Sequence, residues 1–250
     1  MPSMYEIYDS DAAGYDRLVN AEDYRGELRT TLRRLVDWRG ARVVEAGVGT
    51  GRVTRCYVDD ARLVEGFDRS QHMLDRARAN LARWPDRVRL ARAEHLSLPV
   101  ADATADVFVE GWAFGHSVVD AAELGGSDGP EKRRDEPGEA ADRVSSVAAR
   151  LVGEAERVVR PGGTIIIAET LGTNVNVPAA PLPALAAFYR LLEGAYGFAR
   201  ETIRTDYRFA SCEEAAEVCG FFFGPEMGEA VRVRGEAVVP EFTGVFVRTT

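Results

Sequence analysis

Three glycines at alternate positions follow a short apolar run near the start of the chain. Gly47, Gly49 and Gly51 come after residues 41–44, Ala-Arg-Val-Val. The run predicts a buried strand and the glycines predict a turn, which residues 53–58 continue as a helix. Glycine allows a ligand to approach the main chain closely, and a helix N-terminus offers free N–H groups. The pattern therefore predicts a nucleotide-type cofactor site; the alternative is a glycine turn that binds nothing.

The spacing of the glycines differs from the dinucleotide fingerprint. In that fingerprint the third glycine follows the second by three residues, and here Arg52 stands at that position. Glu45 precedes the glycines, and its carboxylate would repel a pyrophosphate but suits the amino group of a cationic ligand. A nicotinamide-dependent oxidoreductase, NAD(P)-linked and with a Rossmann fold, is the alternative that this spacing disfavours.

An acidic residue ends the next predicted strand, residues 63–68. Asp68 lies 17 positions after Gly51, where a carboxylate can accept hydrogen bonds from both hydroxyls of a ribose. Several classes of nucleotide-binding protein share this feature. Asp68 therefore indicates a ribose without choosing between those classes.

A second glycine motif lies more than 100 residues downstream. An amphipathic helix over residues 144–159 is followed by Arg160-Pro161-Gly162-Gly163 and by an apolar strand, residues 164–169. Together with Glu45-x-Gly47-x-Gly49-x-Gly51, this arrangement resembles the class I S-adenosylmethionine-dependent methyltransferases of the small-molecule type. The resemblance is good over residues 43–167 and elsewhere extends only to the order of elements.

The resemblance implies an α/β fold, a Rossmann-like seven-stranded and mostly parallel sheet flanked by helices, with the last strand pair antiparallel. It implies S-adenosylmethionine as the cofactor and a small-molecule methyl acceptor. Met73 would lie against the adenine, with helix core as its alternative role, while Glu94 and the His95 amide would face the adenine edge. The implied cofactor-binding residues are Glu45, Gly47, Val48, Gly49, Gly51, Asp68, Arg69, Met73, Glu94, His95, Glu110 and Trp112.

The reaction centre is expected after the fourth strand, residues 105–110. Members of this family often carry two histidines there, whereas this chain has Gly115-His116 and so only one candidate base. An imidazole with a pKa near 6.5 can take a proton from an acceptor at neutral pH; the alternative is a structural histidine. By the resemblance, the expected substrate-binding residues are Tyr8, Tyr15, Trp112 and His116.

The sequence predicts one domain over residues 1–250, with its cofactor-binding core at 41–170. Residues 1–40 are rich in tyrosine and contain a helical stripe within 25–38, which predicts a cap or lid; the alternative is that the tyrosines only cover the core. Residues 120–142 form a charged insertion, and its apolar-free part, 125–138, is expected to be a mobile lid or a solvated loop.

The C-terminal part, residues 171–250, is expected to contain helices and antiparallel strands. A helix is predicted over 182–196, and Ser211 with Glu214 predicts a capped helix over 211–218. Residues 221–223, 230–233 and 242–248 are predicted as strands and include the antiparallel pair.

Composition limits the partners. A net charge of −9 argues against nucleic acid as a substrate, and no apolar run reaches a membrane span. The polar N-terminus is unlike a secretory signal, so we expect a cytoplasmic protein. The three cysteines lack metal-site spacing, and no metal is expected. The sequence does not separate a monomer from a homodimer, nitrogen from oxygen or sulfur acceptors, or an enzyme from a non-catalytic S-adenosylmethionine-binding protein.

Overall fold

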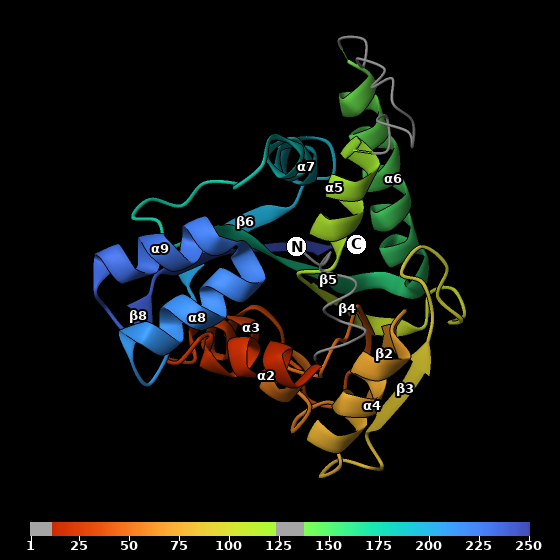
Figure 1. Cartoon of the computed structure of the whole chain (residues 1–250). Coiled ribbons are helices and arrows are strands. Elements are labelled where there is room, and N and C mark those ends of the chain that lie inside the picture. The colour runs from red at the N-terminus through yellow and green to blue at the C-terminus, as the bar shows by residue number, and fades with distance from the viewer. Residues whose placement is uncertain (1–11, 124–137) are drawn as a thin grey trace.

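The computed structural model describes residues 12–123 and 138–250. A seven-stranded sheet crosses the molecule in the order β3-β2-β1-β4-β5-β9-β6 (Figure 1). Strands β1 to β5 pair in parallel, and β9 is antiparallel to both β5 and β6. The predicted α/β fold with an antiparallel end is thus confirmed. The strands are β1 (Arg42–Ala46), β2 (Leu63–Asp68), β3 (Val88–Arg92), β4 (Ala105–Gly111), β5 (Val159–Thr173), β6 (Ala199–Arg204) and β9 (Glu241–Thr249).

Helices cover both faces of this sheet, as Figure 1 shows. They are α2 (Ala12–Ala21), α3 (Glu27–Leu35), α4 (Gln71–Asn80), α5 (Phe114–Glu123), α6 (Glu139–Val158), α7 (Pro183–Gly194), α8 (Cys212–Phe223) and α9 (Pro225–Arg234). A small second sheet pairs β7 (Tyr207–Arg208) with β8 (Val238–Val239). None of the helices in the described ranges is both long and apolar enough to cross a membrane.

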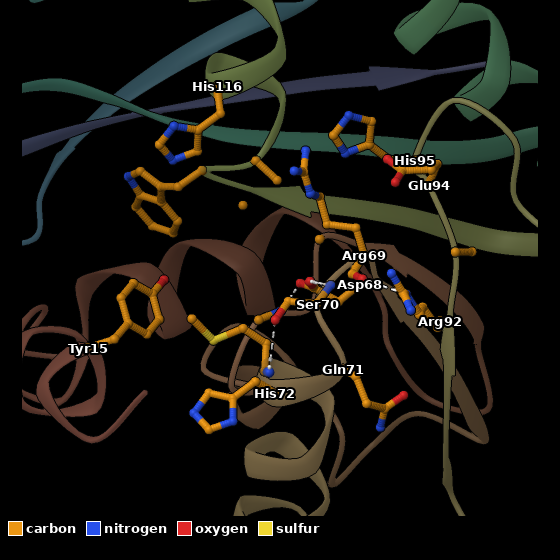
Figure 2. Close-up of a pocket in the computed structure, with 17 residues that line it drawn as sticks. Tyr15, Asp68, Arg69, Ser70, Gln71, His72, Arg92, Glu94, His95 and His116 are labelled. Carbon is orange, nitrogen blue, oxygen red and sulfur yellow. Dashed lines mark hydrogen bonds between the residues drawn. The ribbon is translucent and has the colours of Figure 1, made fainter. Parts of the chain in front are cut away.

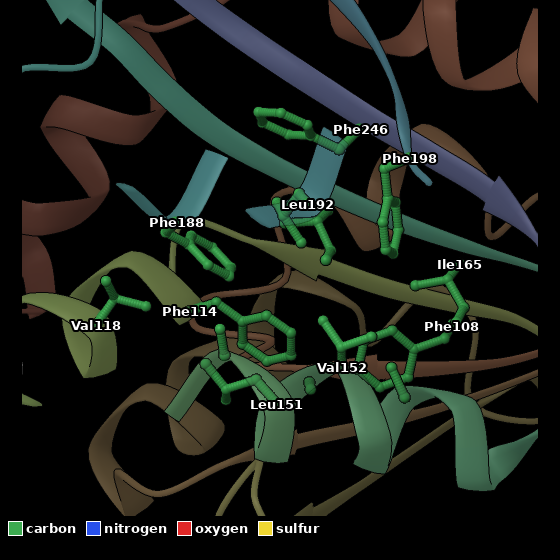
Figure 3. Close-up of a cluster of buried hydrophobic side chains, with 14 of the residues drawn as sticks. Phe108, Phe114, Val118, Leu151, Val152, Ile165, Phe188, Leu192, Phe198 and Phe246 are labelled. Atoms are coloured by element: carbon green, nitrogen blue, oxygen red, sulfur yellow. The ribbon is translucent and has the colours of Figure 1, made fainter. Parts of the chain in front are cut away.

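The central strands are apolar throughout because both of their faces are buried. Side chains alternate between the two faces of a strand, so Phe108 faces one core and its neighbours Val107 and Val109 face the other. The first core joins the sheet to α5, α6 and α7, and Figure 3 shows the labelled Phe108, Leu151 and Phe188 packed within it. In the second core, Leu28 and Leu32 of α3 pack on the opposite face.

Two predicted elements are corrected by the structure. Residues 221–223 and 230–233 belong to α8 and α9 rather than to strands. In α8 the buried Ala215, Val218, Cys219 and Phe222 follow the 3.6-residue period of a helix, which continues past the Ser211 cap. The strands that pair antiparallel with β9 are therefore β5 and β6.

Other boundaries differ less. The predicted helix over 53–58 is a single 3₁₀ turn, η1 (Thr54–Cys56). The charged insertion expected over 120–142 begins and ends within helices, since α5 runs to Glu123 and α6 starts at Glu139. Residues 124–137, to which the mobile-loop prediction applies, and residues 1–11, which include Tyr8, lie outside the described residues.

Candidate active site

A pocket of about 480 Å³ lies at the carboxyl ends of the parallel strands, where open α/β sheets bind ligands. Its volume is within the usual range of small-molecule sites. Figure 2 shows side chains from the β2–α4 turn, from the segment after β3, from α5 and from α2 around it. The residues that line it are Tyr15, Gly47, Gly49, Asp68, Arg69, Ser70, Gln71, His72, Met73, Arg92, Ala93, Glu94, His95, Gly111, Trp112, Ala113 and His116.

The glycine loop needs its glycines for different reasons. Gly47, Gly49 and Gly51 all have positive φ angles, of 68°, 52° and 84°. A Cβ on Gly47 would collide with the Ala113 Cβ, and one on Gly51 would lie 2.7 Å from Leu81 Cδ1. A Cβ on Gly49 would meet no described atom within 4 Å. Gly49 therefore leaves room on the pocket side for a ligand, while the other two allow close packing.

Asp68 joins the glycine loop to the end of β2. Its Oδ2 accepts a hydrogen bond from the Gly49 amide at 2.8 Å, and its Oδ1 accepts one from the Ser70 amide at 2.9 Å. Burial raises the pKa of Asp68, and the two amide bonds partly offset that rise. The carboxylate is held at the pocket wall with lone pairs left for a ligand, which suits the predicted ribose.

Met73 and His95 line the same pocket. Met73 is on α4, whose N-cap Ser70 accepts a hydrogen bond from the Met73 amide. The His95 Nε2 lies 2.7 Å from Ser117 Oγ, and its ring packs edge-on against Phe114. Burial lowers the pKa of His95. Its side chain therefore links the exit of β3 to α5, a contact that the predicted backbone role did not include.

Tyr15, Trp112 and His116 come together at the other side of the pocket. Trp112 has a left-handed backbone, with a φ of 59°, and its amide donates to Ala168 O at 2.8 Å. The Arg52 guanidinium lies 4.1 Å from the centre of the Trp112 ring, and Arg52 also forms a 2.7 Å ion pair with Glu22. Trp112 is thus held in a strained conformation by packing on charged and backbone groups.

Burial sets the protonation of the two polar groups here. It lowers the pKa of His116, so the imidazole is neutral at pH 7. It raises the pKa of Tyr15 to about 12, so the phenol keeps its proton. His116 can accept a proton at neutral pH, whereas the protonated phenol of Tyr15 cannot act as a base and can only form hydrogen bonds.

Four residues expected to bind the cofactor do not line the pocket: Glu45, Val48, Gly51 and Glu110. Glu45 is 1% exposed, and its carboxylate accepts hydrogen bonds from the hydroxyls of Thr54 and Tyr57. Alternation along β1 places Glu45 on the same face as Val43, in the core that contains Tyr57. Direct contact between Glu45 and a cofactor amino group stays a prediction that this geometry does not support.

Glu110 is directed toward α5 instead. Its Oε1 accepts hydrogen bonds from the amides of Ala113 at 2.5 Å and Phe114 at 2.9 Å. Glu169, which sequence reasoning missed, accepts the next amide, Gly115, at 2.5 Å. The only sequence signal for it was an acid at the end of an apolar strand. Also missed were pocket residues that are neighbours of predicted ones: Ser70, Gln71, His72, Arg92, Ala93, Gly111 and Ala113.

Comparisons with known proteins agree with this geometry. A methyltransferase domain family matches residues 43–124. A phosphatidylethanolamine N-methyltransferase of Cereibacter sphaeroides is 30% identical over 223 residues, which are 86% of this chain and 95% of that protein. An uncharacterised methyltransferase of a Geobacillus species is 30% identical over 114 residues, or 44% of this chain, and the match spans only 50% of its length.

The solved structure of the YcgJ protein from Bacillus subtilis shares the fold. It has a TM-score of 0.53 and 11% identity, covering 90% of this chain and 98% of that one. Three findings point to the same family: the 223-residue match to the Cereibacter sphaeroides protein, the match to the methyltransferase domain family, and the hydrogen bond from Gly49 of the glycine loop to Asp68. The chain belongs to the class I S-adenosylmethionine-dependent methyltransferases, and its cofactor is S-adenosylmethionine.

Proposed function

We propose that this protein transfers the methyl group of S-adenosylmethionine to a nitrogen, oxygen or sulfur atom of a small-molecule acceptor, releasing S-adenosylhomocysteine. The observation that carries the proposal is one pocket that joins Gly49 and Asp68 to Tyr15, Trp112 and His116. The net charge of −9 supports a small molecule over a nucleic acid.

The residues present fit the cofactor. The open space at Gly49 and the fixed Asp68 carboxylate suit its ribose and methionine parts. Met73, Glu94 and His95 would border its adenine. When bound, the cofactor supplies a methyl group on a positively charged sulfur that leaves as a neutral thioether.

The chain has two tasks in this reaction. The first is to hold the acceptor in line with the methyl group and away from water, for which the walls formed by Tyr15 and Trp112 are suited. The second arises when the acceptor arrives protonated. The neutral imidazole of His116 would then take the proton as a general base.

An amine is the first acceptor class to test. One relative, which matches 86% of this chain, is named a phosphatidylethanolamine N-methyltransferase, so the acceptor atom of that protein is an amine nitrogen. An ammonium group must lose a proton before it can attack, which matches a neutral histidine at the pocket. Phenols and thiols follow as the second and third classes.

The direct test is turnover on panels of amines, phenols and thiols, followed as formation of S-adenosylhomocysteine by mass spectrometry. We expect product with at least one class, and His116→Ala should lower turnover by roughly 10²–10⁴-fold with unchanged cofactor affinity. His72→Ala is the matched control, because His72 lines the pocket on α4. Binding of S-adenosylmethionine without turnover on any panel would favour the non-catalytic binding protein, and absence of binding would refute the proposal.

A further inference from the structure

Two buried glutamates lie on adjacent strands. Glu110, the residue before the last in β4, is 0% exposed, and Glu169 in β5 is 2% exposed. Glu110 pairs in register with Ile167, two positions before Glu169. Because alternate residues of a strand share a face, both carboxylates point to the sheet face that carries α5, α6 and α7.

Both carboxylates bind the start of α5. Glu110 Oε1 accepts from the amides of Ala113 and Phe114, and Glu169 Oε1 accepts from that of Gly115. These three consecutive N–H groups are among those that a helix leaves unpaired at its N-terminus. The positive end of the helix dipole adds to the attraction. The two carboxyl groups thus take the place of an N-cap side chain, although Glu169 is 54 residues from Gly115 in the sequence.

The position of Glu169 explains the glycine before His116. A Cβ on Gly115 would lie 2.7 Å from Glu169 Oε2 and 3.1 Å from its Cδ. The carboxyl group therefore occupies the space into which a side chain at position 115 would extend.

Two carboxylates on consecutive amides in a buried site cannot both be ionised without a large electrostatic cost. The groups that interact electrostatically with the pair are also acids. Glu45 of β1 interacts with Glu110. Tyr189 of α7 interacts with both glutamates of the pair and with Glu241 of β9. Burial raises the pKa of Glu169 to about 8. Burial and the nearby Glu169 raise that of Glu110 well above its ordinary value.

We propose that Glu110 and Glu169 act as positioning residues: in their protonated forms they bind the first amides of α5 and hold His116 toward the pocket. The inference rests on the proposed function only for the role of His116. When Glu169 loses its proton to solvent, a buried negative charge forms next to Glu110. The first turn of α5, with His116 directly after Gly115, then changes its position.

The test is a histidine NMR titration of the full-length protein saturated with S-adenosylhomocysteine. The chain has three histidines, so each imidazole signal can be assigned by single substitution. We expect the His116 signal to show, besides its own titration, a second inflection near pH 8, where Glu169 loses its proton. His72 on α4 should show none. A wild-type His116 signal without the second inflection would overturn the proposal, whether or not any variant folds.

Substitutions identify the source of that inflection. Glu169→Gln keeps an acceptor for the Gly115 amide but cannot ionise, so it should remove the second inflection. Glu110→Gln should keep it, because burial of Glu169 is what raises the pKa of that group. Glu241→Gln is the matched control, because Glu241 is equally buried and has a pKa raised to about 8, yet binds Thr170 and not α5. Persistence of the inflection in Glu169→Gln, or its loss in Glu241→Gln, would contradict the assignment.

Kinetics give an independent readout once an acceptor is known. Glu169→Ala should lower kcat by up to about 10²-fold, as expected for a misplaced reacting group, while the affinity for S-adenosylhomocysteine stays within about twofold. Glu169→Gln should keep near-normal kcat at pH 7 and lose the fall at alkaline pH. An equal loss of cofactor affinity in Glu169→Ala would show that the pair only supports the pocket. Because the titration needs no turnover, failure of the proposed function and failure of this inference are distinguishable.

Discussion

At the residue scale, Gly49 and Asp68 form the contact on which we expect cofactor binding to depend. The Gly49 amide donates to Asp68 Oδ2 at 2.8 Å, and the absence of a side chain on Gly49 keeps the adjoining space open. Both residues were predictable, because a glycine turn after a strand and an acid at the end of the next strand are local sequence patterns. Glu169 was not, because its importance comes from one contact with Gly115, far away in the sequence.

Gly49→Val should abolish binding of S-adenosylmethionine by filling the ligand space. The matched control is Gly40→Val, because Gly40 also has a positive φ, of 71°, and a Cβ there would meet no described atom within 4 Å, but Gly40 does not line the pocket. Both variants should lose a similar stability, on the order of 1–2 kcal/mol, through backbone strain. Calorimetric titration should show lost binding only for Gly49→Val; equal affinities in the two variants would contradict the pocket assignment.

Asp68→Ala should weaken cofactor binding by roughly 1.5–3 kcal/mol, the usual worth of a hydrogen bond to a charged group. The same change frees the Gly49 amide, so Asp68→Asn, which keeps one acceptor oxygen, should lose less. Asp75→Ala on the exposed side of α4 serves as the control, since Asp75 binds only Gln71 and Arg78 among the described residues. Titration with S-adenosylhomocysteine measures the affinity of all three variants. An unchanged affinity in Asp68→Ala would exclude the Asp68 carboxylate from the site.

At the element scale, the parallel strands and the helices between them followed from hydrophobic periodicity. The closing segments did not, because short apolar runs such as residues 221–223 fit a strand as well as a helix. What decides their state is packing, since Phe222 lies in a cluster with Tyr207 and Val239. The glycine loop was likewise expected to lead into a helix, and the chain there forms only η1.

Arg52 links the N-terminal segment to the glycine loop and to Trp112. It pairs with Glu22, and the exposed fractions of the two side chains are only 15% and 5%. Arg52→Met should therefore leave a buried carboxylate without its ion-pair partner and lower the free energy of unfolding by about 3–5 kcal/mol. Arg29→Met is the control, because the Arg29–Asp59 pair is exposed and should cost less than about 1 kcal/mol. Urea unfolding at pH 7.5 compares them, and similar losses would refute the structural role of Arg52.

At the scale of the whole molecule, acidic side chains gather at the carboxyl end of the sheet, next to the pocket. Glu45, Glu169 and Glu241 come from β1, β5 and β9, and each is 2% exposed or less. The sequence shows acids next to these apolar runs, but not which face of the sheet each acid occupies. That face depends on how the sheet is covered, which is why Glu45 was expected to contact the ligand and lies instead against Thr54 and Tyr57.

This cluster predicts how stability depends on pH. Burial raises the pKa of Glu45 to about 7 and those of Glu169 and Glu241 to about 8, above the ordinary value of 4.5 that applies to the unfolded chain. Between those values the folded state binds more protons than the unfolded state. The stability these groups provide is therefore complete below about pH 4.5 and is lost as the pH rises to 8, at about 1.4 kcal/mol per pH unit for each group.

Carboxyl groups with lowered pKa values have the opposite effect on stability, and they act at lower pH. Hydrogen bonds from backbone amides and arginines lower the pKa values of Asp106 and Glu154, whose stabilisation is present above their unfolded pKa and is lost only in more acidic solution. Burial lowers the pKa values of His95 and His116, so these groups add stability as the pH rises toward 6.5. The free energy of unfolding without ligand should therefore fall between pH 6.5 and 8.5. Denaturant unfolding at several pH values measures this slope, and Glu241→Gln should reduce it because the amide does not titrate. A stability that rises over this interval, or a slope unchanged in Glu241→Gln, would mean that these carboxyl groups are ionised in the folded protein, and the protonated forms proposed for Glu110 and Glu169 would then lose their physical basis.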